Sequence, residues 1–408
     1  MDVISVSREA SQNQTQLVWK GEPDLGGWYT EEEVEAAETA IRNSMDWRRG
    51  FLPHQEITSF ETEFAAFVGG RRALAINGAG TGLDMAMRCL DLSPDDEVIS
   101  CALNFPGTHL AVLGQGARLT LCEPDPVTLN IDVADLERKI TTNTRAILVT
   151  HMSGLAADCN AIATVAARHA HPVHGPIKII YDVARACGAT YDGHRLGAEG
   201  WINVFSFQRK KLMTTLGEGG MIVCSDDETS RKLDQLRSFG AGEGWGTNYK
   251  LTKVQAAVGR VQLRRLDSMN AARVRRARLR TKALSDLAPI VQLPTEREGY
   301  DHVYYLYCVV LPDGWTRQRR DHLIIEMLRK YNVECKVANG PTYWENRLIR
   351  RFTEGQRLPL AESIGSRVIC LPLHPLMTDE DDEYITSAFR DCLKLEVARR
   401  GCDLEACY

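Results

Sequence analysis

Two adjacent lysines, Lys210 and Lys211, stand where an expected strand meets a glycine-rich turn, in the stretch FSFQRKKLMTTLGEGGMIVC at 205–224. A lysine after such a strand lies at the carboxyl edge of the sheet, where open α/β sheets bind their ligands. When it is desolvated beside other cations, its amine becomes a nucleophile toward an aldehyde. The two residues alone leave a second interpretation open, in which they are an exposed pair in a surface loop.

Asp182 ends the apolar run IKIIYD at 177–182. A carboxylate at the end of a buried strand needs a cationic partner, because an unpaired buried charge is costly. The protonated ring nitrogen of pyridoxal 5′-phosphate (PLP) is such a partner, and the protonated ring withdraws electrons from a substrate carbon. The alternative is that Asp182 only caps the turn that follows it.

Two further segments could complete a cofactor site. NGAGTGLDMAM at 77–87 is a glycine-rich turn that opens a helix, and the N–H groups of a helix N-terminus bind anions such as phosphate. Its spacing matches neither the Walker A nor the dinucleotide pattern, so a plain turn is the alternative. LNFPGTH at 103–109 brings Phe105 to the same sheet edge, either to stack on a cofactor ring or as an ordinary core residue.

The elements that must position these residues follow from the hydrophobic pattern. Short β-rich runs alternate with amphipathic helical segments, which predicts an α/β large domain with a mainly parallel mixed sheet flanked by helices. A long helix is expected from about residue 252, followed by a smaller α+β C-terminal domain. The expected division is a flexible N-terminal arm at 1–24, a PLP-binding domain at 25–265 and the smaller domain at 266–408. Strands are expected at 96–100, 118–122, 146–150, 177–182, 202–207, 219–224 and 304–311, and helices near 318–330 and 379–397.

Composition favours small-molecule chemistry. The chain has 408 residues, is 44% hydrophobic and 25% charged, and carries a formal charge of −5, so it lacks the basic excess that attracts nucleic acid or an anionic membrane. The nine basic residues between 260 and 282 are expected to form a solvated face or an ion-pair strip, or alternatively to attract a nucleotide-diphosphate sugar.

The cysteines and the first residues indicate a cytoplasmic protein. Twelve cysteines contain no CxxC pair, and we expect them to be reduced thiols. The first sixteen residues have neither the basic nor the apolar region of a secretion signal. The histidine-rich segment at 169–174 has no cysteine or acidic neighbour in the sequence, so no metal is expected.

In this order, the four segments resemble the DegT/DnrJ/StrS family of PLP-dependent sugar aminotransferases, which have the aspartate aminotransferase fold (type I). The resemblance covers about residues 25–390. Its most specific part is the pattern Ser-aromatic-x₃-Lys-x₅-Gly-Glu-Gly-Gly. In this sequence the pattern is matched by Ser206, Phe207, Lys211 and the stretch 217–220.

The resemblance implies a role for each matching residue. Lys211, rather than Lys210, would hold PLP as a Schiff base. Asp182 would pair with the pyridine nitrogen and Phe105 would stack on the ring. The phosphate would be bound by Gly80, Thr81 and Ser206.

Two more segments extend the resemblance. The stretch at 237–263 is similar to an Arg…Gly…Asn segment whose asparagine, here Asn248, reaches the phosphate in the other subunit, which implies a homodimer with shared active sites. LPLHPLMTDEDDEYI at 371–385 resembles the family's segment near the substrate entrance. His374 is therefore a candidate substrate contact, with a structural histidine between two prolines as the alternative.

Arg185 is a departure from the family pattern. At this position, three residues after Asp182, the family usually has a glutamine that contacts the ring hydroxyl of PLP. A guanidinium there would stabilise the ionised oxygen, or it could turn outward and bind something else.

The activity that the resemblance implies is transfer of an amino group from glutamate or glutamine to a keto-sugar, a nucleotide-linked keto-sugar or a keto-cyclitol, in amino-sugar or antibiotic biosynthesis. One alternative is a PLP-dependent dehydratase or deoxygenase. Some relatives of that kind have a histidine in place of the lysine, so the presence of Lys211 favours transamination. A second alternative is a non-catalytic regulator on the same scaffold.

Overall fold

The core of the protein is a seven-stranded sheet, seen in a computed structural model that describes residues 19–48, 50, 54–337 and 340–398. The strand order is β1-β11-β10-β7-β4-β2-β3. Strand β11 runs antiparallel to both of its neighbours and the other pairs are parallel, which confirms the expected α/β class. The strands are β1 (Arg72–Ile76), β2 (Glu97–Cys101), β3 (Arg118–Cys122), β4 (Thr144–Thr150), β7 (Lys178–Asp182), β10 (Ile202–Ser206) and β11 (Gly220–Cys224).

Helices cover the sheet, as a mostly parallel sheet requires. They are α2 (His54–Val68), α3 (Ala79–Cys89), α4 (Pro106–Leu113), α5 (Val133–Lys139), α6 (Cys159–Ala167), α7 (Asp227–Arg237) and α8 (Lys253–Ala283), and α1 (Glu31–Ser44) packs on the outside of α8. Helix α8 begins with a capping box, in which the Thr252 hydroxyl accepts from the Gln255 N–H and the Gln255 side chain accepts from the Thr252 N–H. Leu83 and Met87 of α3 and its C-cap residue Leu90 lie at helical spacing, and all three are buried.

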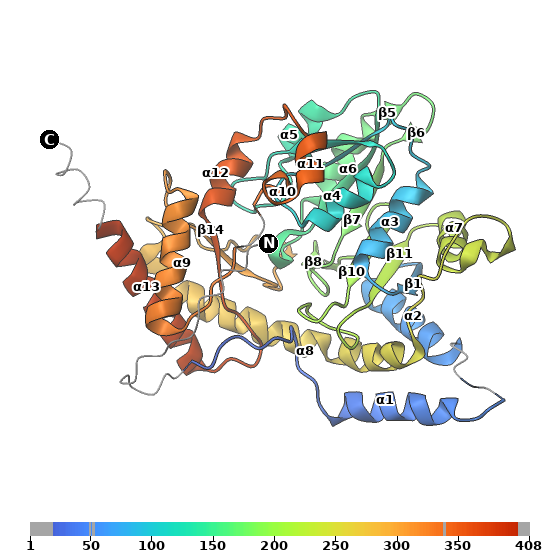
Figure 1. Ribbon diagram of the computed structural model, residues 1–408, viewed down its shortest axis with the longest axis horizontal. Coiled ribbons are helices and arrows are strands. Elements are labelled where there is room, and N and C mark those ends of the chain that lie inside the picture. The colour runs from blue at the N-terminus through green and yellow to red at the C-terminus, as the bar shows by residue number, and fades with distance from the viewer. Residues whose placement is uncertain (1–18, 49, 51–53, 338–339, 399–408) are drawn as a thin grey trace.

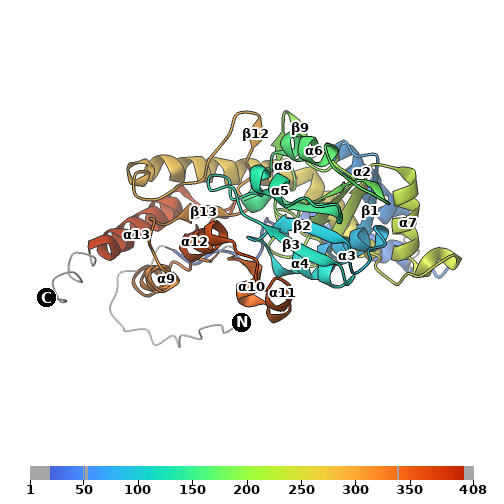
Figure 2. The same cartoon turned by 90° about the horizontal axis from the view of Figure 1, so that it is seen from above.

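A second group of elements lies at the far end of α8 (Figures 1 and 2). It contains β13 (Tyr307–Val310) paired antiparallel with β14 (Val368–Leu371), and the helices α9 (Arg317–Tyr331) and α13 (Asp379–Ala398). Helix α12 (Pro359–Arg367) packs against α9, whereas α10 (Thr342–Glu345) and α11 (Arg347–Phe352) pack against α4 beside the large sheet. The buried side chains form two clusters, one around the large sheet and one around these elements. The expected boundary at 265/266 falls inside the single helix α8, and the domain division stays a prediction.

Short strands complete the description. Strands β8 (Thr190–Tyr191), β9 (His194–Arg195) and β12 (Tyr300–Asp301) form a small sheet, and β5 (Ala170–His171) pairs with β6 (Gly175–Pro176) in the histidine-rich segment. No helix within the described part of the chain is long and apolar enough to span a membrane.

The segment that enters α1 crosses the turn that carries the two lysines. Of the expected arm, residues 1–18 lie outside the described residues, whereas Trp19 is buried in the second cluster and the Glu22 carboxylate lies 2.7 Å from Lys336 Nζ. The Gly26 N–H donates to the Arg209 carbonyl at 2.9 Å. A Cβ on Gly26 would lie 2.1 Å from the Lys211 carbonyl oxygen, so only glycine allows this crossing.

Candidate active site

A cavity of about 780 Å³ lies at the carboxyl edge of the large sheet. It is lined by the ends of β7 and β10, the turns after β1 and β2, and the segments 305–306 and 336–337. Seven of the expected site residues line it, whereas Asn248 and His374 do not. The seven are Gly80, Thr81, Phe105, Asp182, Arg185, Ser206 and Lys211.

Asp182 presents a buried carboxylate to this cavity. Its Oδ2 accepts a hydrogen bond from Thr108 Oγ1 at 3.0 Å and lies 3.4 Å from Thr150 Oγ1, while its Oδ1 accepts from the Ala184 N–H at 3.0 Å. Asn104 Nδ2 donates in turn to Thr150 Oγ1 at 3.0 Å. Among the described residues, the hydrogen bonds to this carboxylate come from neutral donors and no ion pair to it is found. The arrangement suits a cationic ring nitrogen that enters from the cavity.

The opposite part of the lining is an anion cradle. Helix α3 begins there, and its N-cap residue Gly78 provides no side-chain cap, so the first N–H groups remain available to a ligand. A Cβ on Gly220 would lie 2.7 Å from the Phe205 carbonyl oxygen and 3.0 Å from the Gly78 carbonyl carbon, so the glycine permits this close approach. Together with the hydroxyls of Thr81 and Ser206, these groups fit a phosphate. Carboxylate and cradle together therefore match the two polar ends of PLP.

The two lysines have different surroundings, although both border the cavity. Lys210 Nζ lies 2.9 Å from the carboxylate of Asp24, whose side chain is 83% exposed. Lys211 Nζ lies 4.7 Å from the centre of the Tyr305 ring. The geometry therefore separates a surface ion pair at Lys210 from an amine over an aromatic ring at Lys211.

Tyr305 is a site residue that the sequence did not indicate. Burial alone would raise the pKa of its phenol, but the nearby cations Lys211, Arg185 and Arg273 outweigh burial and lower that pKa. Tyr305 enters the cavity from the chain that leads into β13, far from the lysine in sequence. Its only local signal was an aromatic-rich strand pattern, which does not report long-range contacts.

Arg185 and Phe105 both belong to the cavity. Arg185 is only 6% exposed, and its Nη1 lies 3.5 Å from Met152 Sδ. Its guanidinium thus remains inside the site and does not turn to solvent. Phe105 is 59% exposed at the start of α4 and lines the cavity, so it is not a core residue.

Comparison with known proteins agrees with this geometry. Residues 29–390 match the model of the DegT/DnrJ/EryC1/StrS aminotransferase family. The chain belongs to this family. It is a PLP-dependent aminotransferase, which confirms the expected enzyme class and cofactor.

Several relatives resemble the aminotransferase over most of their length. GDP-perosamine synthase of Caulobacter vibrioides is 34% identical, over 83% of this chain and 90% of the relative. A dTDP-3-amino-3,4,6-trideoxy-alpha-D-glucose transaminase of Streptomyces venezuelae is also 34% identical, over 90% and 94%. The crystal structure of S. venezuelae DesV with a ketimine intermediate is 31% identical, covers 89% of this chain and 95% of that one, and has a TM-score of 0.80.

In the aminotransferase, His374 lies outside the cavity lining and ties two segments together. Its Nε2 lies 2.7 Å from the Leu25 carbonyl oxygen and 3.1 Å from that of Gly27, and its Nδ1 accepts from the Leu376 N–H at 3.2 Å. These partners require a neutral ring with the proton on Nε2. Burial and the neighbouring Arg273 lower the pKa of His374 to about 4. The structure thus favours the structural interpretation of His374 and places it under the segment that crosses the lysine turn.

Replacing His374 by glutamine should flatten the dependence of stability on pH. The unfolded chain takes up a proton at a histidine below about pH 6.5, whereas folded His374 stays neutral until about pH 4, so stability is lost as the pH falls through this window. One such group contributes a slope of about 1.4 kcal/mol per pH unit. Denaturant unfolding of both proteins at several pH values within this window measures the difference. Equal slopes would contradict a neutral buried His374.

Asn248 lies on the surface of the aminotransferase. Its side chain is exposed, its backbone pairs with that of Ser238, and it does not line the cavity of its own subunit. A single chain therefore leaves its expected role in a partner's site as a prediction.

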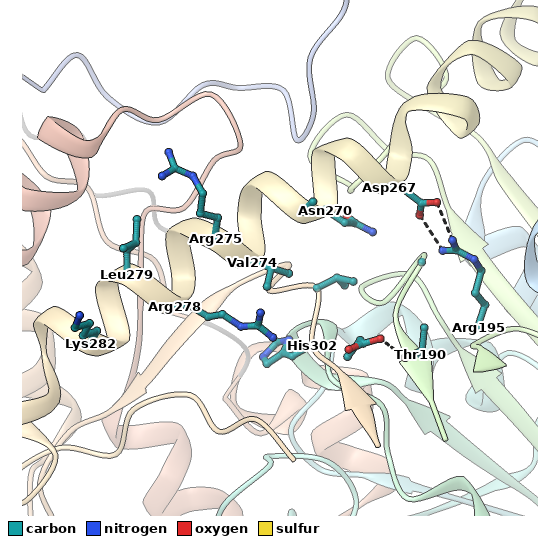
Figure 3. A pocket seen from close by; sticks show the side chains of 14 residues that line it. Thr190, Arg195, Asp267, Asn270, Val274, Arg275, Arg278, Leu279, Lys282 and His302 are labelled. Carbon is teal, nitrogen blue, oxygen red and sulfur yellow. Dashed lines mark hydrogen bonds and ion pairs between the residues drawn. The ribbon is translucent and has the colours of Figure 1, made fainter. Parts of the chain in front are cut away.

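A second cavity, of about 700 Å³, runs along α8, with several charged side chains at its border (Figure 3). The Arg195 guanidinium pairs with Asp267 at 2.7 Å and Arg278 Nε lies 2.9 Å from the Glu296 carboxylate. Other arginines of the basic run pair in the same way: Arg260 with Glu63, Arg265 with Glu33, Arg276 with Asp379 and Arg280 with Asp382. The basic run thus forms the expected ion-pair strip. Lys211 and Asp182, the lysine and carboxylate suited to the chemistry, line the first cavity instead.

Proposed function

We propose that the aminotransferase moves an amino group from an amino acid, glutamate or glutamine, to a nucleotide-linked keto-sugar. The observation that carries this proposal is one cavity bordered by Lys211, the buried Asp182 and the anion cradle at the start of α3. The named activities of the relatives, perosamine synthesis on GDP and amino-sugar formation on dTDP, support a nucleotide-linked acceptor.

The residues that would hold PLP follow from the donors of each part of the cavity. Lys211 carries the cofactor through its Nζ, and the Asp182 carboxylate keeps the proton on the ring nitrogen. The N–H groups at Gly80 and Thr81 and the Ser206 hydroxyl bind the phosphate, and Phe105 covers the ring. Bound PLP supplies an electron-withdrawing ring that stabilises negative charge on the substrate carbon.

Lys211 also performs the proton transfers. With PLP and the donor bound, Lys211 Nζ would take the proton from the donor's α-carbon, and it would return a proton to the corresponding carbon of the acceptor in the second half-reaction. The Tyr305 ring beside Nζ orients the amine and shields it from water. Arg185 lines the cavity at the position where the resemblance expects a glutamine. With PLP bound, its guanidinium would face the ring hydroxyl and stabilise that oxygen as an anion.

The active unit we infer is a homodimer with shared sites. Asn248 is exposed and does not line its own cavity, which supports a contact with the partner's phosphate. The outer face of α1 exposes Val34, Ile41 and Met45, an apolar surface of the kind that forms protein interfaces. The ten described cysteines are unbridged thiols, which supports a cytoplasmic enzyme. A role in amino-sugar or antibiotic biosynthesis is supported by the names of relatives that form amino-sugars and of one relative from erythromycin biosynthesis.

Transfer of a labelled amino group tests the proposal. The purified enzyme is incubated with glutamate or glutamine that carries ¹⁵N at the α-amino group, together with a panel of GDP- and dTDP-linked keto-sugars. The products are identified by mass spectrometry. We expect ¹⁵N on the sugar and the donor converted to its keto acid. Loss of water from the sugar with an unchanged donor would show a dehydratase instead, and no conversion of any acceptor in the panel would contradict a nucleotide-linked keto-sugar as substrate.

A further inference from the structure

We propose that Cys308 and Cys370 are a reversible thiol modification site, which forms a disulfide in the wall of the active-site cavity. The Sγ atoms of these two residues lie 3.4 Å apart. Cys370 lines the cavity, and both side chains are buried.

The position of the two cysteines in the β13–β14 pair favours a bond. They are direct register partners on antiparallel strands. The Cys370 N–H and carbonyl both bond to the backbone of Lys336, at 2.7 and 3.0 Å, and therefore point away from β13. Cys308 and Cys370 are thus a non-hydrogen-bonded pair, the type in which opposite side chains lie closer together. Since a disulfide is about 2.05 Å long, the sulfurs need to approach by only about 1.4 Å.

The surroundings of Cys308 favour a thiolate, which is the reactive form of the residue. Cys370 lies within hydrogen-bonding distance, Ser153 Oγ is 3.1 Å from the Cys308 sulfur, and the Arg185 guanidinium adds a positive charge. The hydrogen bond from Cys370 lowers the pKa of Cys308, and Ser153 and Arg185 act in the same direction against burial.

Other buried cysteines lack these features. Burial raises the pKa of Cys101 and of Cys187 to about 12. Cys101 also faces a cysteine in register, Cys122 on the parallel strand β3, and burial raises the pKa of that thiol too. The pair Cys101–Cys122 is therefore a matched control for Cys308–Cys370.

The oxidant we assign is a small hydroperoxide, which reaches the pair from the side of Cys370, the member that lines the cavity. The Cys308 thiolate attacks one peroxide oxygen, an S–O bond forms, the O–O bond breaks, and the leaving hydroxide takes up a proton to become water. The Cys370 thiol then attacks the sulfur of this sulfenic acid, so that the S–S bond forms and a second water leaves. The two thiols lose two electrons and two protons, and hydrogen peroxide is reduced to two waters.

A disulfide between Cys308 and Cys370 would change the shape of the active-site cavity. Strand β13 directly follows the segment of Tyr305 and Leu306, and the Cys370 backbone is bonded to Lys336, whose side chain also lines the cavity. Drawing the sulfurs together pulls these two parts of the lining toward each other. Disulfide formation itself does not depend on which substrate the enzyme uses.

Peptide mapping of the PLP-loaded, full-length protein tests the proposal. The protein is treated with hydrogen peroxide in small molar excess, unfolded, alkylated, digested and analysed by mass spectrometry without a reductant. We expect a linked peptide pair containing Cys308 and Cys370, two hydrogens lighter than the free peptides, and its disappearance after treatment with a dithiol reductant.

Variants show whether the link is specific. Cys308→Ala and Cys370→Ala should each abolish the linked pair, whereas Cys101→Ala should leave it unchanged. Full alkylation of both cysteines in the peroxide-treated wild-type protein would overturn the proposal, and so would a preferential link between Cys101 and Cys122. The peptide map of the wild-type protein shows whether the Cys308–Cys370 disulfide forms even if a variant does not fold. Its result does not depend on whether the proposed substrate is correct.

Discussion

Replacing Lys211 by alanine is expected to lower the rate of amino transfer by about 10⁴-fold or more, because one side chain both carries the cofactor and moves the proton. PLP can still bind through Asp182 and the anion cradle, so the variant should retain the fold and bind the cofactor without the covalent link. Steady-state kinetics with the acceptor identified by the labelling experiment measure the rate. Visible absorption spectra report the state of the cofactor.

The adjacent lysine is the matched control. Lys210→Ala removes the same charge from the same turn, but Lys210 Nζ pairs with the exposed Asp24. Solvent screens an exposed ion pair so that it contributes little, and kcat should change by no more than a few-fold. If Lys210→Ala abolished activity while Lys211→Ala retained it, the assignment of the two lysines would be reversed. Thermal unfolding of both variants checks that neither result reflects loss of the fold.

Replacing Asp182 by asparagine is the second change with a large expected effect. Asparagine has nearly the same shape and can keep the hydrogen bonds with Thr108 and the Ala184 N–H, but it lacks the charge that holds a proton on the ring nitrogen. Breaking a buried charge pair costs about 3–5 kcal/mol, which corresponds to a fall in kcat of roughly 150- to 5,000-fold. Weaker retention of PLP on dilution should accompany it.

The Thr108→Val variant tests the hydrogen bond to Asp182 separately from the charge of its carboxylate. This variant removes one hydroxyl donor to Oδ2 and leaves the carboxylate in place. The loss of one such bond is worth about 1–2 kcal/mol, so the rate should fall by roughly 5- to 30-fold. An Asp182→Asn enzyme that kept its activity within a few-fold would show that the carboxylate does not hold the ring nitrogen.

Local patterns were enough to predict the parts of the site that lie at strand ends. Asp182 and Ser206 each end a run of buried residues, and the turn before α3 is marked by glycines, so the carboxyl edge of the sheet could be located without coordinates. The spacing from Ser206 to the glycines then distinguished Lys211 from Lys210. Strand β1 was not expected, because RALAI is rich in alanine, and its pairing with β11 stabilises it instead.

The remaining parts depend on contacts between distant segments. Tyr305 reaches Lys211 from the chain before β13, and the residues around Gly26 cross the lysine turn at a backbone distance that excludes any other residue. For His374 the sequence left a substrate contact and a structural role open, and the bonds of its ring to the Leu25 and Gly27 carbonyls favour the structural role. Neither hydrophobic periodicity nor the spacing of residues in a motif predicts contacts between segments so far apart in the sequence.

Reduction of the PLP-loaded protein with borohydride tests the central claim most directly. Borohydride makes the link between PLP and its lysine permanent, and the modified residue is then located by digestion and tandem mass spectrometry. We predict the phosphopyridoxyl group on Lys211, with the peptide of the Lys211→Ala variant unmodified. A group found on Lys210 or another lysine, or no modified lysine in protein that has bound PLP, would contradict the claim.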